Sequence, residues 1–119
     1  MRKVSEVEEQ IALFQWVAAT ETRCSELRLL FHVPNERKCT PAQGAKLKRM
    51  GVKSGVPDLC LPVARKGYHG LWIELKSQKG RVSDRQKEWI ESLKQEGYLA
   101  TVCYGAREAI EVLGKYLDV

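Results

Sequence analysis

The chain has 119 residues, which is enough for one domain with a single hydrophobic core, and we expect residues 1–119 to fold as one unit. Hydrophobic residues make up 44% and charged residues 29%, and no apolar run approaches the roughly 20 residues that span a bilayer. The first residues carry no secretory pattern, so we expect a cytoplasmic protein rather than an exported or membrane-embedded one. The net charge of +5 favours a polyanionic partner.

The first half of the chain predicts two helices and one strand. Residues 5–19 have helical spacing of apolar side chains behind a capping Ser5, with acidic residues in the first turn. Residues 27–33 form a short apolar run that is closed by Pro34, which is typical of a buried strand. Residues 41–50 predict a short basic helix that ends at Gly51.

The second half predicts three strands and two helices. Residues 58–63 and 71–75 favour two strands joined as a hairpin, and residues 83–97 favour a helix with a capping box. A strand over 99–104 and an amphipathic helix over 106–117 follow. The order α-β-α-β-β-α-β-α predicts an α/β fold with a mixed sheet flanked by helices.

The four cysteines are far apart in the sequence and show neither a C-x-x-C pair nor the histidine spacing of a zinc site. In a cytoplasmic protein this favours free thiols. They are Cys24, Cys39, Cys60 and Cys103.

Basic residues concentrate in segments 37–53 and 76–87. The first segment leads directly toward the strand that begins near Asp58, so its cations are candidates for binding a DNA backbone. The alternative is a solvated basic face without a partner. The candidate DNA contacts are Lys46, Lys48, Arg49 and Lys53.

Charged side chains interrupt the predicted hairpin. On a strand, Glu74 and Lys76 share one face, and Asp58 opens the neighbouring strand, where its carboxylate can approach Glu74. Two adjacent carboxylates repel each other unless a cation lies between them, and Mg²⁺ prefers such oxygen ligands. A metal ion and a lysine together suit phosphodiester hydrolysis. The alternative is a buried ion network without chemistry.

These residues also carry a family resemblance. Pro57-Asp58 followed by Glu74-Leu75-Lys76 resembles the core of PD-(D/E)XK nucleases. The chain also resembles the virus-type replication-repair nuclease (VRR-NUC) domain over nearly its whole length. The similar stretches occur in the order found in that family: HVPN at 32–35, GAKLK at 44–48, GVPDL at 55–59, IELK at 73–76 and QKEW at 86–89.

The resemblance implies a restriction-endonuclease-like fold and DNA cleavage that depends on Mg²⁺ or Mn²⁺. It implies Asp58, Glu74 and the Leu75 carbonyl as metal ligands and Lys76 as a catalytic residue. Stand-alone relatives of this size, commonly from phages or bacteria, imply a homodimer that acts on branched DNA such as four-way junctions. The alternatives are a nuclease for flaps or nicked duplex, and a DNA-binding protein of this fold without catalysis.

In such nucleases a glutamate of the first helix completes the metal site, and Glu6, Glu8 and Glu9 all compete for this role. Glu6 continues the apolar stripe through Leu13 and Val17, so we favour Glu6, with Glu9 as its main rival. The alternative for Glu6 is an ordinary acid near a helix N-terminus.

Several further residues have two interpretations. Gln86 matches a glutamine of the family, which implies a catalytic residue beside the site whose amide contacts phosphate or a metal-bound water, but a capping box explains the same residue. A histidine on an apolar strand, such as His32, is more often a core residue than a general base. The three tryptophans fit apolar faces, so we interpret Trp16, Trp72 and Trp89 as core aromatics.

Overall fold

The structure of the protein, a computed structural model, describes residues 4–34 and 39–119. In these residues the elements follow the order α1 (Glu6–Thr20), η1 (Ser25–Leu29), β1 (Phe31–His32), α2 (Pro41–Arg49), β2 (Leu59–Leu61), β3 (Leu71–Lys76), α3 (Asp84–Gln95), β4 (Leu99–Tyr104) and α4 (Ala106–Leu117). None of the described helices is long and apolar enough to cross a membrane.

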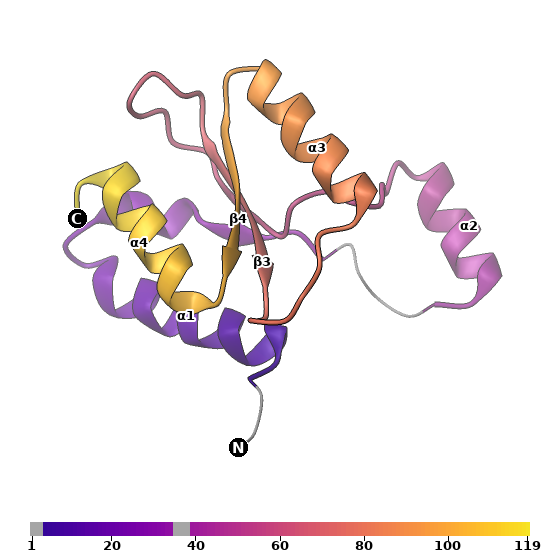
Figure 1. Cartoon of the computed structure of the whole chain (residues 1–119), viewed down its shortest axis with the longest axis horizontal. Helices are drawn as coiled ribbons and strands as arrows, with labels where there is room; N and C mark the ends of the chain where they lie inside the picture. Colours follow the sequence, from indigo (N-terminus) through magenta and orange to yellow (C-terminus); the bar gives the residue numbers. More distant parts are fainter. Residues whose placement is uncertain (1–3, 35–38) are drawn as a thin grey trace.

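The strands of the described residues form one mixed sheet with the order β1-β2-β3-β4. β1 pairs with β2 and β2 with β3 in antiparallel fashion, whereas β3 and β4 are parallel and connected through α3. Figure 1 shows α1 and α4 on one side of β3 and β4 and α3 on the other side. The predicted α/β fold, with its mixed sheet and flanking helices, is confirmed.

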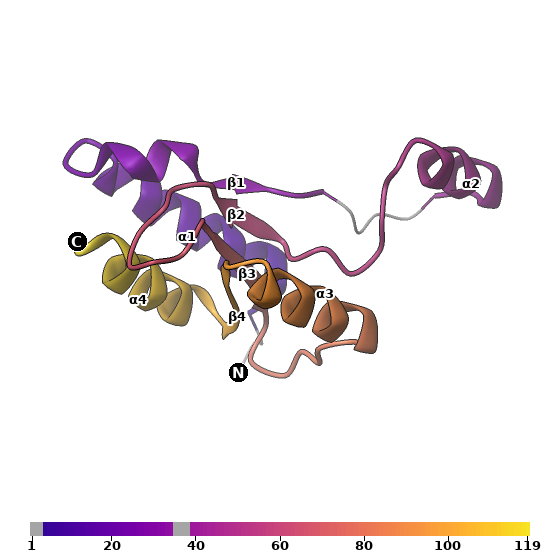
Figure 2. The same ribbon diagram turned by 90° about the horizontal axis from the view of Figure 1, so that it is seen from above.

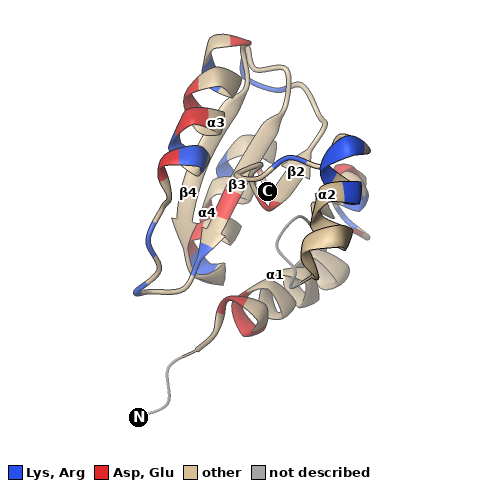
Figure 3. Ribbon diagram, turned by 90° about the vertical axis from the view of Figure 1, so that its right-hand side faces the viewer, with Lys and Arg blue, Asp and Glu red and all other residues tan. Residues whose placement is uncertain are grey.

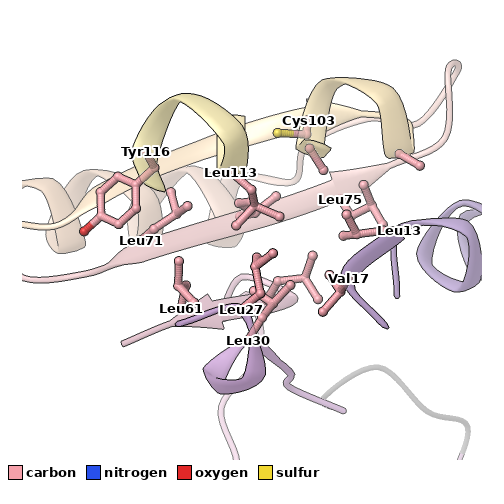
Figure 4. Packing of buried hydrophobic residues seen from close by; sticks show 14 of the residues in the cluster. Leu13, Val17, Leu27, Leu30, Leu61, Leu71, Leu75, Cys103, Leu113 and Tyr116 are labelled. Carbon is pink, nitrogen blue, oxygen red and sulfur yellow. The ribbon is translucent and has the colours of Figure 1, made fainter. Parts of the chain in front are cut away.

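The main core lies between the sheet and the pair α1 and α4 (Figure 4). Alternate residues of β3, namely Leu71, Ile73 and Leu75, are buried in this cluster. Leu13 of α1 and Leu113 of α4 pack against them. Because successive strand residues point to opposite faces, Trp72, Glu74 and Lys76 are directed toward the α3 side.

One predicted strand is largely wrong. In place of a strand over 27–33, residues Ser25–Leu29 form a 3₁₀ helix and only Phe31–His32 are extended. Leu27 and Leu30 are buried and stand three residues apart, which is the spacing that a 3₁₀ turn places on one side. Phe31 is 47% exposed because β1 lies at the edge of the sheet.

α2 stands apart from the body of the molecule (Figure 2). It contains no buried residue, so local interactions rather than packing define its start. Thr40 accepts a hydrogen bond from the Gln43 backbone, the Gln43 side chain accepts one from the Thr40 backbone, and Pro41 occupies the first turn. The described part of the chain thus presents a short basic helix to solvent.

Candidate active site

Asp58 lies at the end of the sheet, immediately before β2, and is 7% exposed. Its Oδ2 accepts a hydrogen bond of 2.9 Å from the backbone N–H of Leu75 on β3. Its own carbonyl accepts a bond of 2.7 Å from the backbone N–H of Val33, which follows β1. Backbone hydrogen bonds from two neighbouring segments therefore fix the position of Asp58, and the one from β3 holds its carboxylate.

Glu74 and Lys76 form a buried ion pair on the α3 side of β3. The Lys76 Nζ atom lies 3.5 Å from Glu74 Oε2, and these side chains are 8% and 1% exposed. The β2–β3 register pairs Leu59 with Ile73, so extending it by one residue places Asp58 opposite Glu74. The hairpin thus brings together the two carboxylates and the lysine that the sequence predicted to meet.

Gln86 forms the predicted capping box and also contacts Glu74. Its Oε1 accepts a hydrogen bond of 2.8 Å from the backbone N–H of Ser83, which completes the capping box of α3. Its Nε2 donates a bond of 3.2 Å to Glu74 Oε2. One buried amide therefore caps the start of α3 and holds the Glu74 carboxylate.

A pocket of about 190 Å³ lies beside Asp58, between the sheet and the first turns of α1. Glu6 lines this pocket, whereas its rivals make contacts elsewhere. Glu8 accepts a hydrogen bond from the Ser5 hydroxyl, and Glu9 accepts one of 3.1 Å from the backbone N–H of Ala106 at the start of α4. Among the three candidates, Glu6 alone is placed at the pocket. The residues that line the pocket are Glu6, Val7, Gln10, Ile11, His32, Asp58 and Leu75.

His32 is not the core residue that the sequence favoured. Its side chain is exposed and lines the same pocket, because β1 is short and lies at the sheet edge. Its Nδ1 lies 3.0 Å from the carbonyl oxygen of Asp58. The apolar run around His32 gave no signal of this exposure, since only the position of β1 in the sheet determines it.

The tryptophans are only partly buried, so their prediction as core aromatics needs correction. Trp16 packs against the edge of the main core, and Trp72 lies on the α3 side with its ring nearly perpendicular to that of Tyr98. Trp89 instead donates a hydrogen bond of 3.0 Å from Nε1 to the carbonyl of Ser54. Trp89 therefore anchors the loop that leads from α2 to Asp58.

That loop is also held by a close approach of Gly55 to α3. Gly55 has φ of +86°, and a Cβ atom built on it would lie 2.9 Å from the backbone carbon of Arg85. Only glycine combines this left-handed backbone with so near a neighbour. The contact lets α3, which orients Glu74 through Gln86, also place the segment that ends at Asp58.

We expect Gly55→Ala to lower the free energy of unfolding by about 1–3 kcal/mol, since the new methyl group adds both a steric clash and a disfavoured φ. Gly51→Ala is a matched control, because Gly51 has φ of +98° and no atom within 4 Å of its virtual Cβ. The free energies of unfolding of the two variants, measured in urea, separate the effect of the steric clash from the effect of the disfavoured φ. Equal losses in both variants would contradict a role for the contact with Arg85.

The donor set at the sheet end fits a hard divalent cation. In residues 4–34 and 39–119, no three His, Cys, Asp and Glu side chains form a cluster that could hold a metal by themselves. Mg²⁺, however, is commonly held by one or two carboxylates and keeps several waters. Asp58 and Glu74 supply two carboxylates, and the Leu75 carbonyl lies on the same side of β3 as the N–H that bonds Asp58.

The cysteines do not provide nucleophilic chemistry near this site. The predicted free thiols are present, and Cys24, Cys60 and Cys103 are buried whereas Cys39 is exposed. Burial raises the pKa of Cys60, two residues after Asp58, to about 11. Burial, followed by the negative charge of Glu108, raises the pKa of Cys103 to about 12. Both thiols therefore stay protonated and weakly nucleophilic at neutral pH.

The predicted DNA contacts lie on and just after α2, and all of these side chains are exposed. Lys46, Lys48 and Arg49 form the last turns of the helix, which Figure 3 shows as a cluster of basic positions. Lys48 and Lys53 line a groove of about 450 Å³ between α2 and the following loop. The basic cluster is thus separate from the buried carboxylates but connected to Asp58 through the loop that Trp89 holds.

Comparisons with known proteins agree with this geometry. The family model described as the VRR-NUC domain matches residues 4–107. A solved structure titled "VRR_NUC domain protein" is 34% identical to this chain, with a TM-score of 0.85, and the match covers 99% of this chain and 92% of that one. The comparison with curated proteins gave no match.

Proposed function

The chain belongs to the VRR-NUC domain family, and from this premise we propose that it is a DNA endonuclease that requires Mg²⁺ or Mn²⁺ and prefers branched DNA. Membership in the family identifies a nuclease of the PD-(D/E)XK type, for which DNA is the substrate and divalent metals are the usual cofactors. The metal requirement of this chain, its preference for four-way junctions and its dimeric state belong to the proposal. So does its location in the cytoplasm of a bacterial or phage-infected cell.

The roles of the site residues follow from their contacts. Asp58, Glu74 and the Leu75 carbonyl would hold the metal, and Glu6 would contribute from the far wall of the pocket. A metal held there would lower the pKa of a bound water and polarise the phosphate. Lys76 carries a positive charge beside Glu74, where it stabilises the negative charge that develops on the phosphate as the bond breaks. Gln86 keeps the Glu74 carboxylate aligned.

The single observation that carries the proposal is the buried arrangement of Asp58, Glu74 and Lys76 at one end of the sheet. Burying three charged side chains costs several kcal/mol unless their partners compensate. One backbone N–H holds Asp58, while Lys76 and Gln86 hold Glu74. These contacts hold Asp58 beside the pocket and Glu74 opposite it on the neighbouring strand, which supports a role for the pair in binding a cation.

The experiment compares cleavage of end-labelled four-way junction, flap, nicked duplex and intact duplex DNA by the purified protein, with Mg²⁺, Mn²⁺ or EDTA. We expect metal-dependent products, with the junction cut fastest. Faster cutting of flaps or nicked duplex would replace the junction preference with the alternative nuclease activity. Binding of all substrates without cleavage under any condition would support the alternative of a catalytically inactive DNA-binding protein.

Neutralising the basic cluster should weaken DNA binding without changing the site. We expect the triple variant Lys46→Gln, Lys48→Gln, Arg49→Gln to lose affinity for all DNA sequences alike, and the salt dependence to flatten by a slope of nearly one for each lost phosphate contact. Fluorescence anisotropy over a series of salt concentrations measures both quantities.

A matched control removes the same charge at the other end of the molecule. Lys66, Lys94 and Lys115 are exposed and lie near the hairpin turn or the ends of α3 and α4. Their combined change to Gln should leave the salt slope close to that of the wild type. Equal effects of the two triple variants would mean that α2 offers only a general basic surface.

We further expect a homodimer, because cutting both strands of a nearly two-fold symmetric junction requires two sites. The helix faces around Trp16 and along α4 are candidate interfaces. The structure adds Val7 and Ile11 on α1, which are 69% and 55% exposed beside the pocket. Sedimentation velocity at micromolar concentration, with and without junction DNA, measures the assembly. A monomer under both conditions would exclude paired sites and favour single-strand cuts.

A further inference from the structure

His32 combines access to the pocket with a fixed ring position. The ring is exposed, lines the pocket together with Glu6 and Asp58, and has Nδ1 3.0 Å from the Asp58 carbonyl oxygen. The same carbonyl oxygen accepts the 2.7 Å hydrogen bond from the Val33 backbone. The histidine is therefore held against the backbone of a proposed metal ligand rather than turned freely into solvent.

The sheet register places His32 on the same face as the pocket. His32 is paired with Leu59, and Leu59 is paired with Ile73, so these cross-strand neighbours share a face. Leu59 and Ile73 belong to the core cluster that packs against α1. The His32 ring consequently lies on the α1 side of the sheet, where Glu6 and Gln10 form the opposite wall of the pocket.

The contact with the carbonyl determines which ring nitrogen carries the proton. A carbonyl oxygen only accepts hydrogen bonds, so the nitrogen that bonds it, Nδ1, must be the donor. In a neutral imidazole the other nitrogen, Nε2, then has a free lone pair and is an acceptor. His32 thus offers one hydrogen-bond acceptor to molecules in the pocket, and a water molecule is the natural donor there.

We propose that His32 positions the attacking water through a hydrogen bond accepted at Nε2; this inference rests on the proposed nuclease function. In the hydrolysis, the water oxygen forms a bond to phosphorus and the bond from phosphorus to the leaving oxygen breaks. The water releases a proton to solvent, and the leaving oxygen gains one from solvent. His32 orients the water and keeps no proton, so its contribution lies in alignment, where misplacement by about 1 Å costs on the order of 100-fold in rate.

Two conservative variants separate this role from simple support of Asp58. Asn at position 32 retains an amide N–H near the place of Nδ1 but has nothing at the place of Nε2. Gln puts its amide group near the place of Nε2. We expect His32→Asn to lower kcat by about 100-fold with unchanged KM for DNA, and His32→Gln to remain within about 10-fold of the wild type.

Two other patterns of activity in these variants would overturn the proposal. Full activity of His32→Asn with an impaired His32→Gln would assign the histidine to support of the Asp58 backbone alone. A raised KM with unchanged kcat in both variants would assign it to DNA binding. His69→Gln is the matched control, because His69 is the second of the two histidines and lies in the β2–β3 hairpin.

A readout independent of catalysis is the tautomer of His32, measured by long-range ¹H–¹⁵N NMR of the imidazole and assigned with His69→Gln. We expect protonated Nδ1 and unprotonated Nε2 in the neutral ring. A proton on Nε2 would overturn the inference even if the protein cuts DNA. A wild-type protein that cuts no DNA would refute the proposed function and this role together, whereas normal cutting by His32→Asn would refute this role alone.

Discussion

Asp58→Asn and Glu74→Gln should each lower metal-dependent cleavage by more than about 100-fold while DNA binding and the fold persist. Both changes preserve shape and remove one negative charge from the pair that would hold the cation. The Asn oxygen can still accept the hydrogen bond from the Leu75 backbone, and the Gln oxygen can still accept the bond from Gln86. Single-turnover cleavage, anisotropy with labelled DNA and thermal unfolding measure the three properties separately.

Asp58→Ala is a useful comparison because it removes the acceptor as well as the charge. The buried Leu75 N–H then loses its partner, which costs about 1–3 kcal/mol of stability, so this variant should unfold more easily than Asp58→Asn. Wild-type cleavage rates in Asp58→Asn and Glu74→Gln would rule out the carboxylates as metal ligands.

Lys76→Met should lower the cleavage rate at saturating metal by about 10²–10³-fold, with metal affinity retained. The change keeps the buried stem and removes the charge 3.5 Å from Glu74 Oε2. The transition state then loses a positive charge, whereas the carboxylates that would bind the metal remain. Titration calorimetry with Mn²⁺ and single-turnover kinetics distinguish the two effects.

Lys79→Met is the control for Lys76→Met, since Lys79 is exposed in the loop after β3. Its cleavage rate should stay close to that of the wild type. If Lys76→Met instead weakened metal binding and left turnover at saturating metal unchanged, Lys76 would have a structural role.

The sequence alone predicted the helix and the strands that carry the candidate site. Period-two alternation placed Glu74 and Lys76 on one face of a strand, and the short connection between the strands predicted the hairpin that brings Asp58 to them. Helical spacing favoured Glu6 over Glu9, and the structure places Glu6 at the pocket. The positions of these side chains could be predicted because they depend on local periodicity and on the pairing of adjacent strands, whereas their chemical roles stay predictions.

Other features depend on contacts between distant segments and could not be predicted in this way. The exposure of His32 follows from the edge position of β1, and Glu9 bonds the start of α4, which lies far along the chain. The short apolar run at 27–33, closed by a proline, predicts a strand, but periodicity does not distinguish so short a run from a 3₁₀ turn. The spacing of Trp89 predicted a core aromatic. Its hydrogen bond to Ser54 could not be predicted because it depends on how the loop between α2 and Asp58 packs against α3.

Metal-dependent cleavage tests the central claim most directly. Labelled four-way junction DNA is incubated with wild-type protein and with Asp58→Asn, first in EDTA and then with increasing Mg²⁺ or Mn²⁺. We predict no products in EDTA, products that increase with metal for the wild type, and at least about 100-fold slower cleavage by Asp58→Asn at every metal concentration. Cleavage in EDTA, or equal cleavage by the two proteins, would contradict a metal site built on Asp58 and Glu74.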